Sequence, residues 1–357
     1  MTSCDSQRPP LKIALMGLGR AMMEDHYPVL LANPGLFKVV CACDLVKERR
    51  DLVGRDFPEC RMYRRFADML DESYVDLVLI ATCSADHVAH ALMSLKKGFW
   101  TVLESPMALT AEDAMVLKGA AVKAQNRLVV VQRGYFEPDF MLARKMMSDS
   151  RLGAIHQVRV RREDYIRRDD WQCVKRLGGG AAYYAMPDMI LQALKLLPFP
   201  PVQMWSELKR IASLGDSEDY ARISLKTREQ ISADVEFSGG VLPANRSPSF
   251  VISGERGAFK VSPGASKGVL DVIDPDYRFE RRRASVRTPA FTDMHEKIAV
   301  ARIPVSLEGA GEFGLPAFWR RVYDSIRTAA PFPLSLEDSI EAVKFAHLMK
   351  KTSPFGK

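Results

Sequence analysis

The feature that most constrains the fold is an alternation of short apolar runs and amphipathic stretches over the first third of the chain. The apolar runs, each short enough for one strand, lie at residues 11–16, 37–43, 75–81, 100–103 and 128–131. Continuous apolar strands of this kind are typical of a parallel sheet covered on both faces. The stretches 85–97 and 111–125 have helical spacing, and Thr110 with Asp113 forms a helix-start signal. Strand–helix alternation predicts right-handed βαβ units and hence a doubly wound sheet.

The pattern changes after residue 132. Longer segments alternate apolar and polar side chains, which indicates an antiparallel sheet with one face packed and the other open. These segments lie at 155–163, 202–211, 220–227, 230–237 and 250–253. Helical spacing occurs at 139–147, 181–197, 315–329 and 336–350. We therefore expect a second α/β domain with a large, open, mainly antiparallel sheet.

A chain of 357 residues with 47% hydrophobic residues is too long for one ordinary domain. The expected division is a tail at 1–10, a doubly wound domain at 11–132 and an α/β domain at 133–357, whose last helix can pack back on the first domain. No apolar run approaches the roughly 18 residues that span a bilayer, and the first residues lack the apolar core of a signal peptide. We expect a disordered tail, no membrane partner and a cytoplasmic location.

The cysteines and the charge argue against two other classes of protein. Six cysteines occur without a CxxC pair or the spacing of a zinc site, which favours a reducing compartment and no bound metal. The net charge is +7, but acidic residues are interspersed among the arginine clusters at 159–162, 167–168 and 281–283, and no nucleic-acid-binding motif accompanies them. Solvated faces or a pocket for an anionic ligand explain these clusters better than a nucleic-acid partner.

A glycine-rich segment, 17–22, follows the first expected strand and opens a helix. Gly17 permits a tight turn, and Gly19 lets the backbone approach a pyrophosphate at the positive end of the helix, which begins with Arg20 and Ala21. Met22 stands where the dinucleotide-binding fingerprint has its third glycine. The segment predicts a bound nicotinamide dinucleotide.

An acidic residue, Asp44, ends the second expected strand, where a carboxylate accepts hydrogen bonds from the adenosine ribose. This position favours NAD over NADP, because a 2′-phosphate would lie beside a negative charge. Lys47, Arg49 and Arg50 follow closely and leave NADP open. The alternative interpretation makes Asp44 the N-cap of the next helix.

The stretch Ala81-Thr82-Cys83-Ser84-Ala85-Asp86-His87 and the later Glu104-Ser105-Pro106 resemble motifs of the Gfo/Idh/MocA oxidoreductase family. The likeness continues through 132–140, 178–180, 187–194 and 254–259 and into the last two helices. It implies a Rossmann domain followed by an α/β domain whose open sheet makes dimers or tetramers. It also implies NAD(P) chemistry on sugars, cyclitols or similar polyols, with Glu104 near the nicotinamide ribose and a cofactor lining of Thr82, Cys83, Ser84 and His87.

Three positions depart from that family's pattern. The lysine of its Glu-Lys-Pro motif is Ser105 here, and the Asp or Asn and the His that follow its glycine segment are Tyr184 and Asp188. Serine only hydrogen-bonds, whereas removal of an alcohol proton needs an acid or base. Asp188 is a candidate base, and Tyr184 lies one helical turn before it on the same face. The alternative is that Asp188 forms a cap or salt bridge and the tyrosines pack.

Further polar residues fall in segments that border the ligand pocket in the family. Arg161 and Arg162 point to opposite faces of a strand, so only one of them can face the pocket, and Arg161 is our choice. Trp171 can stack on a sugar ring or belong to the core. The candidate substrate residues are Arg133, Arg161, Asp164, Trp171 and Tyr183. The histidines show no spacing with acidic residues that indicates a metal site.

Three functions remain open on these observations. The first is an NAD(P)-dependent dehydrogenase or reductase acting on a sugar-like ligand, with Asp188 or Tyr184 in place of the usual acid or base. The second is a protein that binds a dinucleotide or sugar without redox turnover. The third is a glycoside hydrolase or lyase that uses bound NAD transiently, and it needs the same hydride step as the first.

Overall fold

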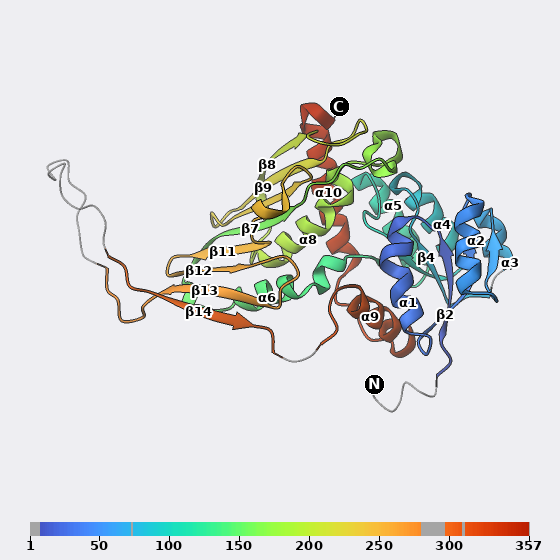
Figure 1. Ribbon diagram of the computed structural model, residues 1–357, viewed down its shortest axis with the longest axis horizontal. Coiled ribbons are helices and arrows are strands. Elements are labelled where there is room, and N and C mark those ends of the chain that lie inside the picture. Colours follow the sequence, from blue (N-terminus) through green and yellow to red (C-terminus); the bar gives the residue numbers. More distant parts are fainter. Residues whose placement is uncertain (1–7, 73, 280–296, 309–310, 357) are drawn as a thin grey trace.

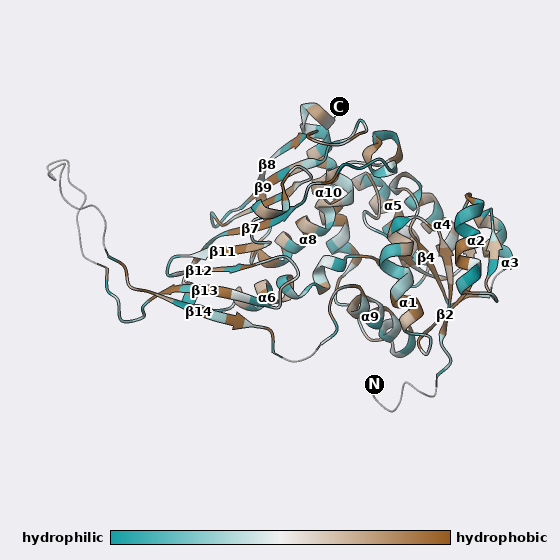
Figure 2. Ribbon diagram, viewed as in Figure 1, coloured by the Kyte–Doolittle hydropathy of each residue, from teal (hydrophilic) through white to brown (hydrophobic). Residues whose placement is uncertain are grey.

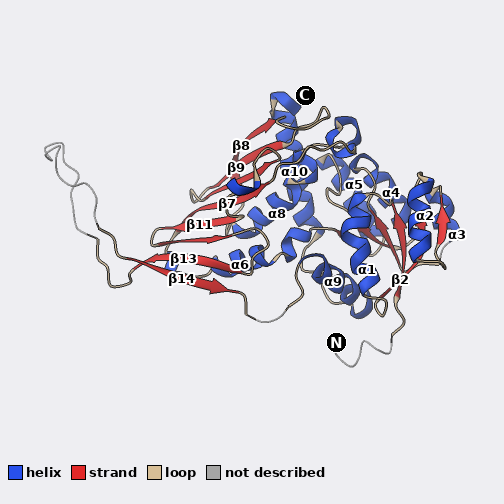
Figure 3. Cartoon of the chain, viewed as in Figure 1, coloured by secondary structure: helices blue, strands red, loops and turns tan. Residues whose placement is uncertain are grey.

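The structure is a computed structural model, and it describes residues 8–356 except 73, 280–296 and 309–310. Residues 1–7 of the tail expected at 1–10 lie outside the described residues, as does the arginine cluster at 281–283. Two sheets, each with its own helices, make up the fold (Figure 1; Figure 3). Among the described residues, no helix combines the length and the apolar character that crossing a bilayer requires.

The first sheet is parallel and has the strand order β3-β2-β1-β4-β5-β6. Its order reverses between β1 and β4, and ligands of such sheets bind beyond the carboxyl ends of the strands at this switch point. The predicted doubly wound sheet is thereby confirmed. One strand escaped prediction because it is short and polar and lies at an edge. The strands are β1 (Leu11–Met16), β2 (Phe37–Cys43), β3 (Arg61–Tyr63), β4 (Leu77–Ile80), β5 (Trp100–Leu103) and β6 (Leu128–Val130).

Helices cover both faces of this sheet, and an apolar cluster fills each interface. In Figure 2 the ribbon of its strands carries mainly the colour of hydrophobic residues. The expected cap at Thr110 is present, because its side chain accepts the Asp113 N–H. A six-residue π-helical turn, Ala21–His26, runs directly into the first helix. The helices are α1 (Tyr27–Ala32), α2 (Lys47–Asp56), α3 (Phe66–Glu72), α4 (His87–Lys96) and α5 (Ala111–Lys123).

The second sheet has eight strands in the order β14-β13-β12-β11-β7-β10-β9-β8. Every neighbouring pair is antiparallel except β7 with β10, which confirms the predicted, mainly antiparallel sheet. The strands are β7 (Ile155–Glu163), β8 (Pro201–Lys209), β9 (Tyr220–Thr227), β10 (Ser232–Ser238), β11 (Phe250–Gly254), β12 (Gly257–Val261), β13 (Lys267–Ile273) and β14 (Val300–Ser306).

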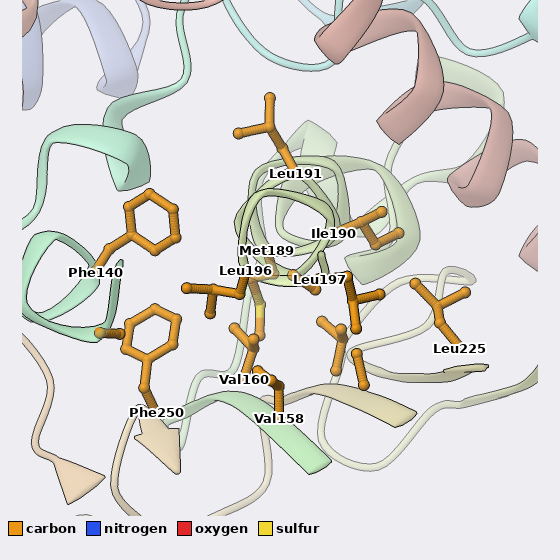
Figure 4. Close-up of a cluster of buried hydrophobic side chains, with 14 of the residues drawn as sticks. Phe140, Val158, Val160, Met189, Ile190, Leu191, Leu196, Leu197, Leu225 and Phe250 are labelled. Atoms are coloured by element: carbon orange, nitrogen blue, oxygen red, sulfur yellow. The ribbon is translucent and has the colours of Figure 1, made fainter. Parts of the chain in front are cut away.

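One face of the second sheet is packed against α6 (Pro138–Met146), α8 (Met186–Leu196) and α10 (Leu336–Thr352). Figure 4 shows Val158 and Val160 of β7 beneath α8, with Phe140 and Phe250 beside it. Burial alternates along β9, as expected for a sheet with one covered face. Helix α9 (Gly314–Thr328) instead packs on the first domain, where Trp319 and Tyr323 are almost fully buried.

The single helix predicted over 181–197 is wrong. The chain forms α7 (Ala181–Tyr184) and α8, separated at Ala185, whose backbone is not helical. The cause is Pro187, because in a continuous helix its ring would clash with the carbonyl of Tyr183, four residues earlier. The break leaves α7 as a separate turn directly after the glycine segment 178–180.

Candidate functional site

The glycine-rich turn after β1 leaves space for a ligand beside the backbone. Gly17 has a φ of +84°, and a Cβ there would lie 2.8 Å from the Ala81 carbonyl oxygen, so this position requires glycine. A Cβ at Gly19 would meet nothing within 4 Å. The turn feeds the helical segment that begins at Ala21, whose amino end favours an anion. These features fit a pyrophosphate group.

Asp44 is tied to the glycine-rich turn. Its Oδ2 atom accepts the Leu18 N–H at 2.7 Å, and its Oδ1 atom accepts the Val46 N–H at 2.8 Å. Arg49 Nη1 lies 3.6 Å from Oδ2, and Arg50 donates to the Asp44 carbonyl oxygen at 2.6 Å. The alternative interpretation of Asp44 as a helix cap is wrong, because Val46 occupies the N-cap of α2. Asp44 thus orders the turn and lies beside two arginines.

The loop after β4 is held to the loop after β5 by His87, which is 1% exposed. Its Nδ1 atom lies 2.8 Å from the Pro106 carbonyl oxygen and its Nε2 atom 3.1 Å from that of Thr82. Burial lowers the pKa of His87 despite these two acceptors, so the ring is neutral and donates to one of them. Ser84 Oγ is buried and has no hydrogen-bond partner among the residues described.

Glu104 follows β5 and connects the site to the buried interior. Its Oε1 atom lies 2.6 Å from Nε2 of His26, and its Oε2 atom accepts the Ser105 N–H at 2.9 Å. Burial alone would raise the pKa of Glu104, but the hydrogen bonds from His26 and from the Ser105 N–H outweigh it, and the pKa lies below its ordinary value. Glu104 is therefore an ionised, partly exposed carboxylate.

A cavity of about 470 Å³ lies between the two domains, at the carboxyl ends of the first sheet. It is lined by residues of the glycine-rich turn, the loops after β4 and β5, and the covered side of the second sheet. It brings together most of the predicted site residues, namely Gly19, Arg20, Ala21, Thr82, His87, Glu104, Ser105, Arg133, Asp164, Trp171, Tyr184 and Asp188. Its lining does not include Gly17, Asp44, Cys83, Ser84, Arg161 or Tyr183.

Asp188 lines the cavity as one half of an ion pair. Both of its oxygens accept the Gly134 N–H, at 3.2 and 3.1 Å, and Oδ2 lies 3.2 Å from Nη1 of Arg162. The salt-bridge role left open by the sequence is therefore present. A carboxylate has about four lone-pair directions, so Asp188 retains capacity to accept a further hydrogen bond.

Tyr184 lines the cavity beside Asp188, although the helix breaks between them. Its ring packs edge-on against Phe237 at 5.4 Å, and the Arg168 guanidinium lies 4.8 Å from the ring centre. Burial, followed by the nearby carboxylates Asp219 and Glu218, raises the pKa of Tyr184 far above its ordinary value. The phenol therefore keeps its proton at neutral pH and can donate a hydrogen bond but not act as a base.

Two predicted substrate residues point away from the cavity. Arg162 and not Arg161 lines it, because Arg162 shares the face of β7 that carries Val158 and Val160, whereas Arg161 contacts Ser247. Period-two parity with the two valines could have identified Arg162 from the sequence. The Lys350 ammonium lies 5.1 Å from the centre of the Tyr183 ring. Burial raises the pKa of Tyr183 to about 12.

Every arginine that lines the cavity is paired with a carboxylate. The pairs are Arg20 and Arg168 with Asp170, Arg133 with Asp25, Arg162 with Asp188, and Arg246 with Asp164. Arg246 comes from the loop before β11 and carried no signal in the sequence. The lining therefore offers many hydrogen-bonding groups whose charges are largely compensated. Among the described residues, no group of three or more acidic, His or Cys side chains is placed to hold a metal ion.

Two family models match this chain. One, described as an oxidoreductase family with an NAD-binding Rossmann fold, covers residues 11–132. The other, described as the GFO/IDH/MocA C-terminal domain, covers residues 140–260. Together the two matches span more than half of the chain.

Similar proteins extend over almost the whole length. The chain is 22% identical to scyllo-inositol 2-dehydrogenase (NADP(+)) IolW of Bacillus subtilis, over 96% of this chain and 94% of that protein. The aldose-aldose oxidoreductase of Caulobacter crescentus, complexed with glycerol, superposes with a TM-score of 0.76 at 18% identity, over 96% and 97% of the two chains. The WlbA dehydrogenase of Bordetella pertussis, in complex with NADH and UDP-GlcNAcA, gives 0.74 at 18% identity, over 97% and 96%.

Proposed function

The chain belongs to the GFO/IDH/MocA oxidoreductase family, and from this premise we propose that it transfers a hydride between a nicotinamide dinucleotide and a carbinol carbon of a neutral sugar, cyclitol or related polyol. The observation that carries the proposal is the cavity between the domains. Its lining combines the glycine-rich turn and Glu104 on one side with Tyr184 and Asp188 on the other. A hydride donor and an acceptor must lie side by side, and this cavity adjoins both half-sites.

The dinucleotide is held by the first domain. Gly17 and Gly19 give the pyrophosphate access to the backbone, and the loop at Thr82 to Ser84 with Glu104 borders the nicotinamide half. When bound, the nicotinamide ring supplies the hydride chemistry, and the protein supplies orientation and proton transfer.

Proton transfer is assigned to Asp188 in the direction of alcohol oxidation. Ser105 keeps its proton, and the raised pKa of Tyr184 leaves that phenol protonated as well. Asp188 has a lone pair free after its bonds to Gly134 and Arg162 and lines the cavity. It accepts the alcohol proton while Tyr184 donates a hydrogen bond to the same oxygen.

The class of substrate follows from the charge of the lining. Each arginine in the lining already has a carboxylate partner. An anionic ligand would therefore gain little charge attraction from these arginines. A polyol, in contrast, can use the remaining N–H groups and lone pairs without separating any ion pair. Trp171, which also lines the cavity, offers a flat surface on which a sugar ring can stack.

A second candidate function is binding without redox turnover. The observation that favours it is Asp188 itself, whose carboxylate is engaged by Arg162 and Gly134 while Ser105 replaces a lysine. The two candidates share the dinucleotide site and differ in whether a hydride and a proton are transferred.

We also propose that the protein forms a homodimer or homotetramer through the open face of the second sheet. Trp205 of β8 is 53% exposed on that face, and the Arg222 guanidinium lies 5.8 Å from its ring. An exposed tryptophan in a sheet is a frequent centre of a protein interface. Sedimentation velocity of the wild type and of Trp205→Ala tests this, and a wild-type monomer at micromolar concentration contradicts it.

The test of the proposed function is a fluorescence titration with NADH and, separately, NADPH, followed by an assay for reduced dinucleotide with scyllo-inositol, myo-inositol, glucose and glycerol. Saturable binding with polyol-dependent reduction of the dinucleotide supports the oxidoreductase. Saturable binding without reduction on any polyol supports the binding protein. Cleavage of a glycoside without net reduction points to the hydrolase or lyase, and a folded sample that binds neither dinucleotide refutes the proposal.

A further inference from the structure

One carboxylate, that of Asp170, pairs with arginines from both sides of the cavity. Its Oδ2 atom lies 2.9 Å from Nη2 of Arg20, which follows Gly19 in the glycine-rich turn, and 2.9 Å from Nη1 of Arg168 in the second domain. Its Oδ1 atom accepts the Gln172 N–H at 3.0 Å, which fixes the carboxylate at the start of the short helix 171–173. Asp170 thus connects the cofactor side of the cavity with the substrate side.

The two arginines differ in how firmly they are held. The Arg168 side chain is 16% exposed, and its guanidinium lies over the Tyr184 ring at 4.8 Å. The Arg20 side chain is 46% exposed, and besides Asp170 it has only a 3.3 Å contact to Gln172 Oε1 and a 3.9 Å contact to Glu24 among the described residues. Two guanidinium groups therefore share one carboxylate, and Arg20 is the one that can leave it.

A pyrophosphate is the anion for which Arg20 is placed. Arg20 and Gly19 line the same cavity, and the space beside Gly19 is open. Guanidinium groups bind phosphate oxygens in a bidentate manner, whereas the Oδ2 atom of Asp170 is shared between Arg20 and Arg168. Movement of Arg20 from Asp170 to a phosphate leaves no charge unpaired, because Asp170 keeps Arg168.

We propose that Asp170 is a positioning residue that couples the two halves of the site. A dinucleotide draws Arg20 away from Asp170, and Asp170 then holds Arg168 alone over Tyr184, where the polyol binds. This inference rests on the proposed function, because it needs a pyrophosphate at the glycine-rich turn.

The first test is the affinity for NADH of Asp170→Asn, in which the amide oxygen still accepts the Gln172 N–H. Loss of a competing carboxylate frees Arg20, so the variant binds NADH roughly two- to five-fold more tightly than the wild type, the range of an exposed ion pair. In the background Arg20→Gln, the same substitution has no effect on NADH affinity. A general change in charge is controlled by Asp25→Asn, because Asp25 lines the same cavity but pairs with Arg133 at 2.9 Å.

The second test uses Arg168→Gln, whose side chain belongs to the substrate side. Without Arg168, Asp170 is left to Arg20 alone and holds it more firmly, so NADH binds more weakly. Adding Asp170→Asn abolishes this effect. A merely structural role of Arg168 would weaken NADH binding in both backgrounds, and unfolding midpoints of all variants identify any that are misfolded.

The outcomes separate this inference from the proposed function. A wild type that binds neither NADH nor NADPH overturns both. If the wild type binds NADH, two results overturn the coupling alone. One is that Asp170→Asn binds NADH no more tightly than the wild type. The other is that Asp25→Asn increases the affinity for NADH as much as Asp170→Asn does. The coupling is established if Asp170→Asn strengthens NADH binding and Arg168→Gln weakens it. In addition, the first effect must vanish in the Arg20→Gln background and the second in the Asp170→Asn background.

Discussion

Trp319 of α9 donates a hydrogen bond from its indole nitrogen to Nδ1 of His26 at 3.1 Å, and both side chains are almost fully buried. An indole nitrogen can only donate, so Nδ1 of His26 is an acceptor and the ring carries its proton on Nε2. Nε2 therefore donates to Glu104, which borders the cavity. A helix near the end of the chain thus sets the tautomer of a histidine that orients a carboxylate of the site.

Replacement of Trp319 by phenylalanine removes this donor and leaves Nδ1 of His26 buried without a partner. We expect a loss of about 1–3 kcal/mol in the free energy of unfolding, measured by urea denaturation. Phe37→Leu is the packing control, because Phe37 contacts the same indole ring without hydrogen-bonding to it. Nitrogen NMR of the His26 ring distinguishes the causes, since only Trp319→Phe removes the hydrogen bond to Nδ1 and shifts the Nδ1 resonance, while Nε2 keeps its proton against Glu104. An unchanged Nδ1 resonance in that variant contradicts the assignment.

Glu104→Gln should change how stability depends on pH. The pKa of Glu104 is lower in the folded protein than its ordinary value, so the carboxylate stabilises the fold above the unfolded pKa of about 4.3 and that contribution is lost as the pH falls further. The unfolding midpoint of the wild type therefore falls more steeply with acid than that of Glu104→Gln. Glu48→Gln, at an exposed position of α2, provides the control. Parallel midpoint curves for wild type and Glu104→Gln count against the role of His26.

The first half of the site could be predicted from the sequence because its determinants are local. A glycine-rich turn after an apolar strand and an acid at the end of the next one are short-range patterns, and the structure places Gly17, Gly19 and Asp44 together at the switch point of the first sheet. The alternation of side chains along β7 places Arg162 on the same face as Val158 and Val160. It therefore identifies Arg162 as facing the cavity only once these two valines are known to be buried.

The contacts that span long sequence separations could not be predicted in this way. Trp319 reaches His26 across 293 residues, and Lys350 reaches Glu218 across 132. Such pairs depend on how α9 and α10 pack on the two domains, which periodicity does not specify. The break at Ala185 runs against the helical spacing of 181–197, because a proline at 187, four residues after Tyr183, disfavours a continuous helix.

Lys350 and Glu218 form a buried ion pair that supports α7. Glu218 Oε2 accepts from Lys350 Nζ at 2.6 Å, while Oε1 accepts the Ala182 N–H at 3.1 Å. Lys350→Met leaves the fully buried carboxylate uncompensated and is expected to cost about 3–5 kcal/mol in urea denaturation. The double variant with Glu218→Gln recovers much of that loss, because the amide oxygen still accepts the Ala182 N–H. Additive losses in the double variant would show that the two residues act independently.

Arg49 is predicted to decide how well NADP is accepted. Its side chain is 52% exposed and lies 3.6 Å from Asp44, at the position where a 2′-phosphate would lie beside that carboxylate. Arg49→Gln should weaken NADPH binding roughly three- to five-fold and leave NADH binding unchanged, as measured by competitive titration. Lys47→Gln is the matched control, because Lys47 is paired with Asp51 and not with Asp44. Equal losses for both dinucleotides would mean that Arg49 contributes only general charge.

Asp188→Asn tests the assignment of the base. The amide cannot accept and hold the alcohol proton, so turnover on any polyol that the wild type oxidises should fall at least about 100-fold, while NADH affinity is retained. Because Asp188 also holds Arg162, loss of that ion pair needs its own control, and Arg162→Gln provides it by leaving the carboxylate in place. If Arg162→Gln loses as much turnover as Asp188→Asn, the carboxylate acts by positioning Arg162. If Asp188→Asn retains full turnover, the proton is accepted elsewhere, and Glu104, ionised and on the same cavity, becomes the residue to replace next.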